Sequence, residues 1–193
     1  MRLLLVLITS AACAQQFSAG IVGGAALSSD FQSQPSPTLT ESTSKDYIVG
    51  GMLELSLPAH LSLEVDGLYR PMNFLSFTSS IPRGTAPGNT VVTWEFPILA
   101  KYRFNNPKAA PFLELGPSFR TAGNLNDTSP SNHGITAGTG VEMTLHKLRI
   151  LPEFRYTRWA ADYIAQVYQP RTNPNQAEVL IGWSFPARKT RRD

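Results

Sequence analysis

Several kinds of residue are scarce in this chain, and each scarcity excludes a class of protein. The 193 residues include one cysteine, Cys13, and three histidines. Cys13 lies in an N-terminal segment with the features of a secretion signal, so we expect the mature chain to form no disulfide and no cysteine-based metal site. Lysine and arginine nearly balance aspartate and glutamate, at 17 against 14. We therefore expect no basic surface of the kind that binds nucleic acid.

Long apolar runs are also missing. The run from Leu3 to Ile8 is too short to cross a bilayer as a helix. It follows Arg2 and precedes an A-x-A site that ends at Ala14, so residues 1–14 are predicted to be a signal peptide. A lipid-carrying Cys13 is the alternative, but Ser10 stands where such a signal has an aliphatic residue. Residues 15–187 then form one domain, and residues 188–193 form a short basic tail.

After the signal, apolar residues recur at every second position, and no amphipathic helical stretch stands out. This period predicts β-strands. Eight strands are expected, at about residues 17–26, 47–57, 61–69, 91–104, 111–120, 134–145, 148–159 and 178–185.

The connections between these strands alternate in length. Long polar segments at 28–46, 71–89, 121–133 and 160–174 alternate with short turns at 58–60, 105–108 and 146–147. An even number of strands of about ten residues, with all short turns on one side, is typical of outer-membrane barrels. The sequence therefore predicts an all-β fold, an eight-stranded antiparallel up-and-down transmembrane β-barrel with both termini in the periplasm.

Charged residues recur on the face opposite the apolar one, where they would line the lumen. Mixed signs on an inward face can pair across strands, whereas on a lipid-facing surface each charge would cost several kcal/mol. The predicted lumen charge network consists of Glu54, Glu64, Asp66, Arg70, Glu95, Lys101, Arg103, Glu114, Arg120, Glu142, Arg149, Glu153, Arg155 and Glu178.

Aromatic residues concentrate near the ends of the apolar faces and predict a girdle at each membrane interface. Its members are Trp94, Phe96, Tyr102, Phe104, Phe119, Phe154, Tyr156, Trp183 and Phe185. A soluble lipocalin-like binder is the competing interpretation. It would place an apolar face inside the barrel and would need no aromatic rings at the strand ends.

The last strand ends in Gly182-Trp183-Ser184-Phe185, which resembles the aromatic-ended assembly signal of small outer-membrane barrels. With the strand pattern and loop alternation, the chain resembles the eight-stranded OmpA/OmpX-type barrels over the mature sequence to about Phe185. This resemblance implies a location in the bacterial outer membrane. It also implies contact with outer-membrane lipid and lipopolysaccharide, and with the machinery that assembles such barrels. One difference is that eight residues follow Phe185.

No phosphate-binding loop, metal cluster or nucleotide motif is present, so no cofactor is expected. An eight-stranded barrel is only wide enough for side chains to fill, which favours a structural network over a narrow ion path. We expect a structural or surface-interaction role and no enzymatic activity.

The sequence leaves two further functions open. The alternative enzyme is a lipid A-modifying hydrolase that would use His133, near Asp127, Ser129 and Ser131. Apolar residues in or near the long loops, such as Met72 and Trp159, are expected to extend the strands above the membrane and to join the interfacial belt. The alternative is that they bind a hydrophobic ligand or a surface partner. Other members of these loop sets are Phe74, Phe77, Tyr163 and Tyr168.

Overall fold

The structure is a computed structural model that describes residues 16–31, 38–42, 47–78, 88–106, 109–123, 128–146, 148–161, 163–164 and 172–186. The predicted signal peptide and basic tail lie outside the described residues, as do Asp127 and Tyr168. In the part of the chain that is described, no helix is long and apolar enough to cross a membrane.

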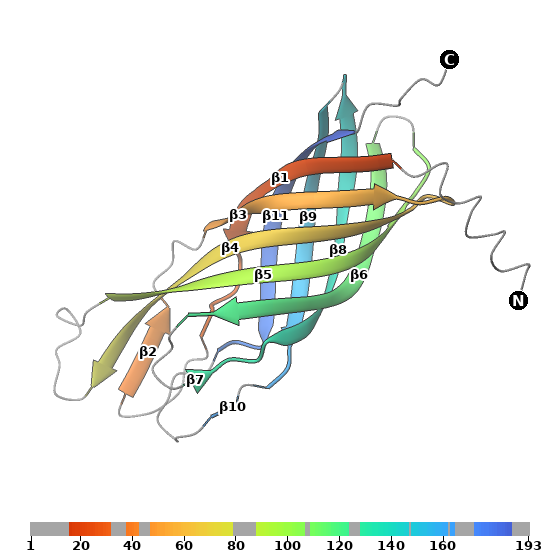
Figure 1. The fold of residues 1–193 in the computed structure, drawn as a ribbon. Coiled ribbons are helices and arrows are strands. Elements are labelled where there is room, and N and C mark those ends of the chain that lie inside the picture. The colour runs from red at the N-terminus through yellow and green to blue at the C-terminus, as the bar shows by residue number, and fades with distance from the viewer. Residues whose placement is uncertain are drawn as a thin grey trace, which may run out of the picture.

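Eight strands of the main sheet form the barrel, as the period-two pattern predicts. They are β1 (Gln16–Ala26), β3 (Tyr47–Ser56), β4 (Leu61–Thr78), β5 (Gly88–Arg103), β6 (Ala109–Ala122), β8 (His133–Leu145), β9 (Leu148–Trp159) and β11 (Asn175–Pro186). Each pairs antiparallel with the strands before and after it, and β1 pairs with β11. The sheet therefore closes into an up-and-down barrel. The strands β1, β3, β4 and β5 form the front wall of the barrel in Figure 1. They cross the strands of the back wall, such as β9 and β11, at a large angle.

The register fixes how far the strands are staggered. One path of paired residues runs once round the barrel, from Gln16 through Ser56, Ser62, Lys101, Glu114, Gly138, Arg155 and Glu178 to Ala26. It returns to β1 ten residues beyond its start, which is the shear of the barrel. Eight strands with this stagger tilt by about 40° and enclose a space that side chains fill.

Both ends of the barrel follow the predicted arrangement. Ser18 at the start of β1 pairs with Pro186 at the end of β11, so both strands have these ends at the side of the short turns. The turn after β3 is tight, and Ala59 and His60 both have left-handed backbone angles, with φ of 61° and 62°. Leu57 N donates to Leu61 O across this turn at 2.8 Å.

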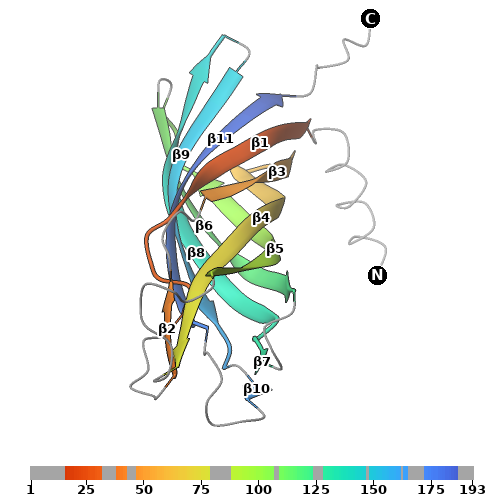
Figure 2. The same ribbon diagram turned by 90° about the vertical axis from the view of Figure 1, so that its left-hand side faces the viewer.

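On the long-loop side the strands extend beyond the ranges given above, as expected if Met72 and its neighbours continue a strand. β4 continues to Thr78 and β5 begins at Gly88, within a stretch expected to be a loop. A short strand, β2 (Thr38–Ser42), pairs with the end of β4 beside β3 (Figure 2). The paired backbone groups explain why strands persist in a sequence rich in loop-forming residues. Two further short strands, β7 (Thr128–Ser129) and β10 (Tyr163–Ile164), pair with each other.

Residues of alternating parity face opposite sides of the barrel wall. Ile21, Leu113, Leu115 and Ile135 are each more than half exposed on the outer surface, although all are apolar. Inward positions carry charges, hydroxyl groups and glycines, together with one apolar cluster that consists of Val22, Ile48, Met52, Leu68 and Leu180. At Gly116 an added Cβ would lie 1.9 Å from Ile98 O, so this inward position allows no side chain without separating the strands. The outer surface is thus apolar and the interior holds most of the charged groups, the arrangement of a membrane barrel.

Candidate functional site

The lumen is the candidate site, because it gathers nearly all the charged side chains that the structure describes. Glu54, Glu64, Asp66, Arg70, Glu95, Lys101, Arg103, Glu114, Arg120, Glu142, Arg149, Glu153, Arg155 and Glu178 all have inward positions. Most are buried, and Arg103 and Glu142 are partly so. All of them except Arg120 form three clusters stacked along the barrel axis.

The lower cluster, nearest the short turns, is a ring of two arginines and two glutamates. Arg103 contacts Glu54 and Glu142, each at 2.5 Å. Arg149 contacts the same two carboxylates, at 3.2 Å and 2.7 Å. Ser62 accepts a further hydrogen bond from Arg103 at 2.8 Å. The cluster contains equal positive and negative charge, so every carboxylate lies between two cations.

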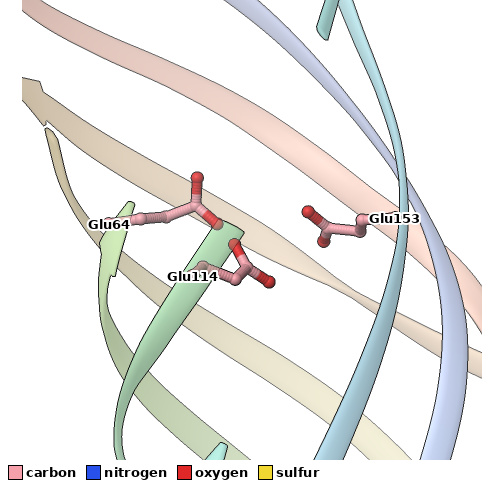
Figure 3. Close-up of side chains that lie close together, drawn as sticks. All are labelled: Glu64, Glu114 and Glu153. Atoms are coloured by element: carbon pink, nitrogen blue, oxygen red, sulfur yellow. The ribbon is translucent and has the colours of Figure 1, made fainter. Parts of the chain in front are cut away.

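The middle cluster joins three glutamates from different strands to two cations. Glu64, Glu114 and Glu153 point toward one another across the lumen (Figure 3), with oxygens within 4.8 Å of one another. Lys101 Nζ lies 2.6, 3.2 and 3.8 Å from their Oε2 atoms. Arg155 binds their Oε1 atoms at 2.7, 2.7 and 2.9 Å. The glutamate oxygens that could hold a metal ion therefore surround the Lys101 ammonium group instead.

The charge of the middle cluster does not balance. Asp66 also belongs to it, because Arg155 Nη1 donates to Asp66 Oδ2 at 2.6 Å. Two cations therefore face four carboxylates, and Asp66 Oδ1 has no hydrogen-bond partner among the described residues. Ionised groups in a low-dielectric interior are costly unless they are paired. Arg155 and Lys101 are consequently the residues on which this cluster depends.

The upper cluster centres on Arg70, below the long-loop mouth. Arg70 Nη2 contacts Asp30 at 2.8 Å, and Nη1 contacts Glu178 at 3.3 Å and Glu95 at 3.8 Å. Asp30 lies beyond the end of β1, so the chain must bend inward to place it here. Its backbone is held there, because Asn173 N donates to Asp30 O at 2.7 Å.

A lid formed by residues 28–31 covers the upper cluster. Phe31 is 3% exposed and packs with Met72 and Val91, and it forms a β-bridge with Thr172. Ser28 Oγ accepts from Ala177 N at 3.0 Å. The lid thus joins a buried ion pair to an apolar contact at the mouth of the barrel.

Trp159 and Met72 are inward residues, whereas the sequence predicts that they belong to an interfacial belt or to a binding surface near the long loops. Trp159 is 2% exposed, donates to Gln176 Oε1 at 2.6 Å, and packs its ring against the Arg120 guanidinium at 4.3 Å. Arg120 also donates to Ser131 O at 2.6 Å. Met72 lies past the predicted end of its strand because β4 continues to Thr78, whereas Trp159 is the last residue of β9 as predicted. In both strands the alternation of side chains turns these residues inward. The side chains of Phe74, Phe77 and Tyr163 lie outside the described residues.

The predicted girdle residues face outward. Those exposed on the outer surface are Trp94, Phe96, Tyr102, Phe104, Phe119, Phe154, Tyr156 and Phe185, and Trp183 is half-buried. Near the long loops, Tyr69 packs edge-on against Trp94 with ring centroids 5.5 Å apart. Near the short turns, Tyr102 and Phe104 pack at 5.2 Å. Phe154 differs from the expectation, because it lies half-way along β9.

The sequence analysis assigned two charged residues to neither face of the barrel wall. The alternation of side chains along each strand could have identified both. Asp30 has the same parity as inward Ser18 and Val22, but its segment was expected to be a loop. Arg158 has the parity of outward Tyr156 and is exposed on the outer face of β9. In each case the period of two extends beyond the residues that the sequence analysis assigned to a face.

His133 does not form a catalytic arrangement with the described residues near it. Its side chain is exposed, and Nδ1 lies 2.9 Å from Asn132 Oδ1. Ser131 Oγ donates to the backbone oxygen of His133 at 2.9 Å. The side chains of Asp127 and Ser129 are not among those described.

A closed eight-stranded barrel with an ionic interior and an apolar outer belt defines a class of protein, the small outer-membrane β-barrels. The bacterial outer membrane is where barrels of this kind reside. The apolar outer belt and the ion pairs of the lumen exclude a soluble lipocalin-like barrel, whose outer face would be polar.

Comparison with known proteins agrees with this class. No family model and no curated protein sequence matches the chain. Among solved structures, the chain resembles the outer membrane protein AlkL, determined by solid-state NMR in lipid bilayers, with a TM-score of 0.57 and 11% identity over 92% of each chain. It also resembles Neisserial surface protein A (NspA), with a TM-score of 0.53 and 16% identity over 88% of this chain and 96% of the other. Because the sequence identities are this low, the likeness shows a shared fold alone.

Proposed function

We propose that this chain is a non-catalytic outer-membrane barrel, closed to ions by its own side chains, that acts as a structural and surface-interaction protein. The observation that carries this proposal is the stack of three ion-paired clusters beneath a lid. Large side chains from β4, β5 and β9 fill the lumen, and Arg70, Lys101 and Arg155 are fully buried. An aqueous path would have to separate these pairs.

Conductance in a planar lipid bilayer tests the proposal. The refolded wild-type protein is expected to give no stable conductance steps, because the lower and middle clusters remain paired. A gel assay in which the folded band migrates differently before and after boiling serves to show that the inserted protein is a folded barrel. Regular conductance steps from such a sample would contradict the closed lumen and favour a gated ion path.

The surface-interaction part of the proposal is supported by the barrel wall, which extends past the mouth. β4 continues to Thr78 and pairs there with β2, beyond the residues that pair with β3. This extension presents backbone and loops outside the membrane, where a partner could reach them. Replacing residues 73–87 with a short turn is expected to leave the barrel folded and to abolish the binding of the barrel to its surface partner.

Recognition of the final strand by the barrel-assembly machinery is a further part of the proposal. Phe185 is 63% exposed on the outer face of β11 and pairs in register with Ala19. Truncating it to alanine removes little from the lumen, so F185A is expected to refold in detergent like wild type while accumulating less in outer membranes. Equal outer-membrane levels of both proteins would contradict this role.

A lipid A hydrolase is the second candidate function, and the contacts of His133 do not favour it. We expect H133A to leave the lipid A of expressing cells unchanged relative to wild type, as measured by mass spectrometry of extracted lipid. A modification of lipid A that depends on wild-type protein and disappears with H133A would establish catalysis instead.

A further inference from the structure

Arg158 occupies an unusual position for a charged residue in this barrel. Every other acidic, lysine or arginine side chain that the structure describes lies in the lumen or under the lid, whereas Arg158 is exposed on the outer face of β9. An outward arginine is costly at the bilayer midplane and nearly free of cost at the interface. The depth of Arg158 in the bilayer therefore determines both its energetic cost and the lipid groups that it can contact.

The register places Arg158 at the outer interface. It pairs with Ile135 on β8 and with Asn175 on β11, one residue before β9 ends at Trp159. Outward Tyr156 precedes it by two positions, on the side of the bilayer. An arginine just beyond a belt of aromatic rings lies at the level of lipid head groups.

Neighbouring polar groups orient the guanidinium. Arg158 Nη1 donates to Asn175 Oδ1, which also accepts a hydrogen bond from the Tyr156 hydroxyl at 2.5 Å. This shared acceptor fixes one edge of the guanidinium on the barrel wall. Among the described residues no partner is found for Arg158 Nε and Nη2, the two nitrogens of the guanidinium edge that would face a group outside the protein.

His133 adds a second donor on the same rim. It precedes Ile135 by two positions on β8, so both side chains share the outward face and His133 lies diagonally from Arg158. Such diagonal neighbours are about 7–8 Å apart, within reach of a long side chain. No described acidic side chain faces outward near them to repel an anion.

We propose that Arg158, oriented by Asn175 and assisted by His133, binds a phosphate group of an outer-leaflet glycolipid, the lipid A part of lipopolysaccharide. A planar guanidinium matches phosphate oxygens with two parallel hydrogen bonds. The acyl chains of the same lipid would lie along the apolar wall below, which includes Ile135. This site goes beyond the proposed function and requires only that the long loops face the outer leaflet.

The experiment measures binding of lipid A to the folded barrel in non-ionic detergent by native mass spectrometry. Bisphosphorylated lipid A is expected to bind wild type more tightly than lipid A stripped of its phosphates. R158Q is expected to lose roughly tenfold in affinity for the bisphosphorylated lipid, the effect of one charge-assisted contact. R158K should lie between the two proteins, because it keeps the charge but loses the paired geometry. V49Q, which alters an outward position near the long-loop end of β3 on the other side of the barrel, should bind like wild type.

Three results would overturn the proposal. One is equal binding of the phosphorylated and the stripped lipid to wild type. Another is unchanged affinity in R158Q, provided that its mobility shift on boiling shows a folded barrel. The third is competition by inorganic phosphate at concentrations comparable to the lipid, since this would define a general anion site without a requirement for the lipid.

Discussion

Lys101 holds the middle cluster together, because its ammonium lies among three glutamate oxygens that would otherwise face one another. Replacing it with methionine leaves a buried excess of negative charge and is expected to lower the free energy of unfolding by about 3–5 kcal/mol. Calcium favours carboxylate oxygens and should bind in the vacated space. Urea unfolding in detergent checks this. Added Ca²⁺ should raise the midpoint of K101M and leave the wild-type midpoint unchanged, and an equal response of both proteins would contradict it.

Glutamates of the same cluster are not equivalent. Glu64 contacts Lys101 at 2.6 Å and Arg155 at 2.7 Å, whereas Glu153 contacts Lys101 only at 3.8 Å. The cluster has two carboxylates more than its cations, so removing the weaker one reduces repulsion. We expect E64Q to lower the free energy of unfolding by about 1–3 kcal/mol, and E153Q to leave it unchanged or to raise it. Parallel urea titrations would refute this if E153Q proved the more destabilised.

At the scale of the element, the turn between β3 and β4 stores strain that a substitution can remove. Ala59 and His60 both adopt left-handed backbone angles, which cost residues with a Cβ about 1–2 kcal/mol. Asparagine followed by glycine suits such a two-residue turn. The A59N/H60G protein is therefore expected to unfold at a higher urea concentration than wild type.

A glycine substitution at another short turn provides the control. Asn105 has no left-handed angle, because the described residues with this conformation and a side chain are Ala59, His60 and His146. N105G should relieve no strain and should leave the midpoint unchanged or slightly lower. Equal stabilisation by N105G and A59N/H60G would show that turn flexibility, rather than backbone strain, controls the midpoint.

For the whole molecule, the apolar belt predicts that the cost of an outward charge depends on depth. Leu115 is 58% exposed at the middle of β6, whereas Thr121 lies near the outer end of the same strand. In lipid vesicles L115R is expected to lose about 2–4 kcal/mol of folding free energy and T121R about 0–1 kcal/mol. Equal costs for both, as expected of a water-exposed outer face, would contradict the membrane orientation.

The sequence predicted the fold more completely than it predicted the contacts within the site. A strict period of two and alternating connections were enough for an eight-stranded barrel with charges such as Glu64 and Arg155 facing inward. Parity is a local property, so the sequence reveals it directly. The strand ends were harder to predict from the sequence. β4 continues to Thr78 because β2 pairs with it, and this pairing joins segments more than thirty residues apart.

What the sequence determined by itself is which side chains face lipid and which face the lumen, because the strand period assigns every residue to a side. Only the tertiary structure decided which charges meet. The stagger of ten residues brings Lys101 and Arg155 to the same glutamates, and the bend after β1 brings Asp30 to Arg70. Such contacts depend on the register of all eight strands and on loop paths, and no local pattern encodes either of them.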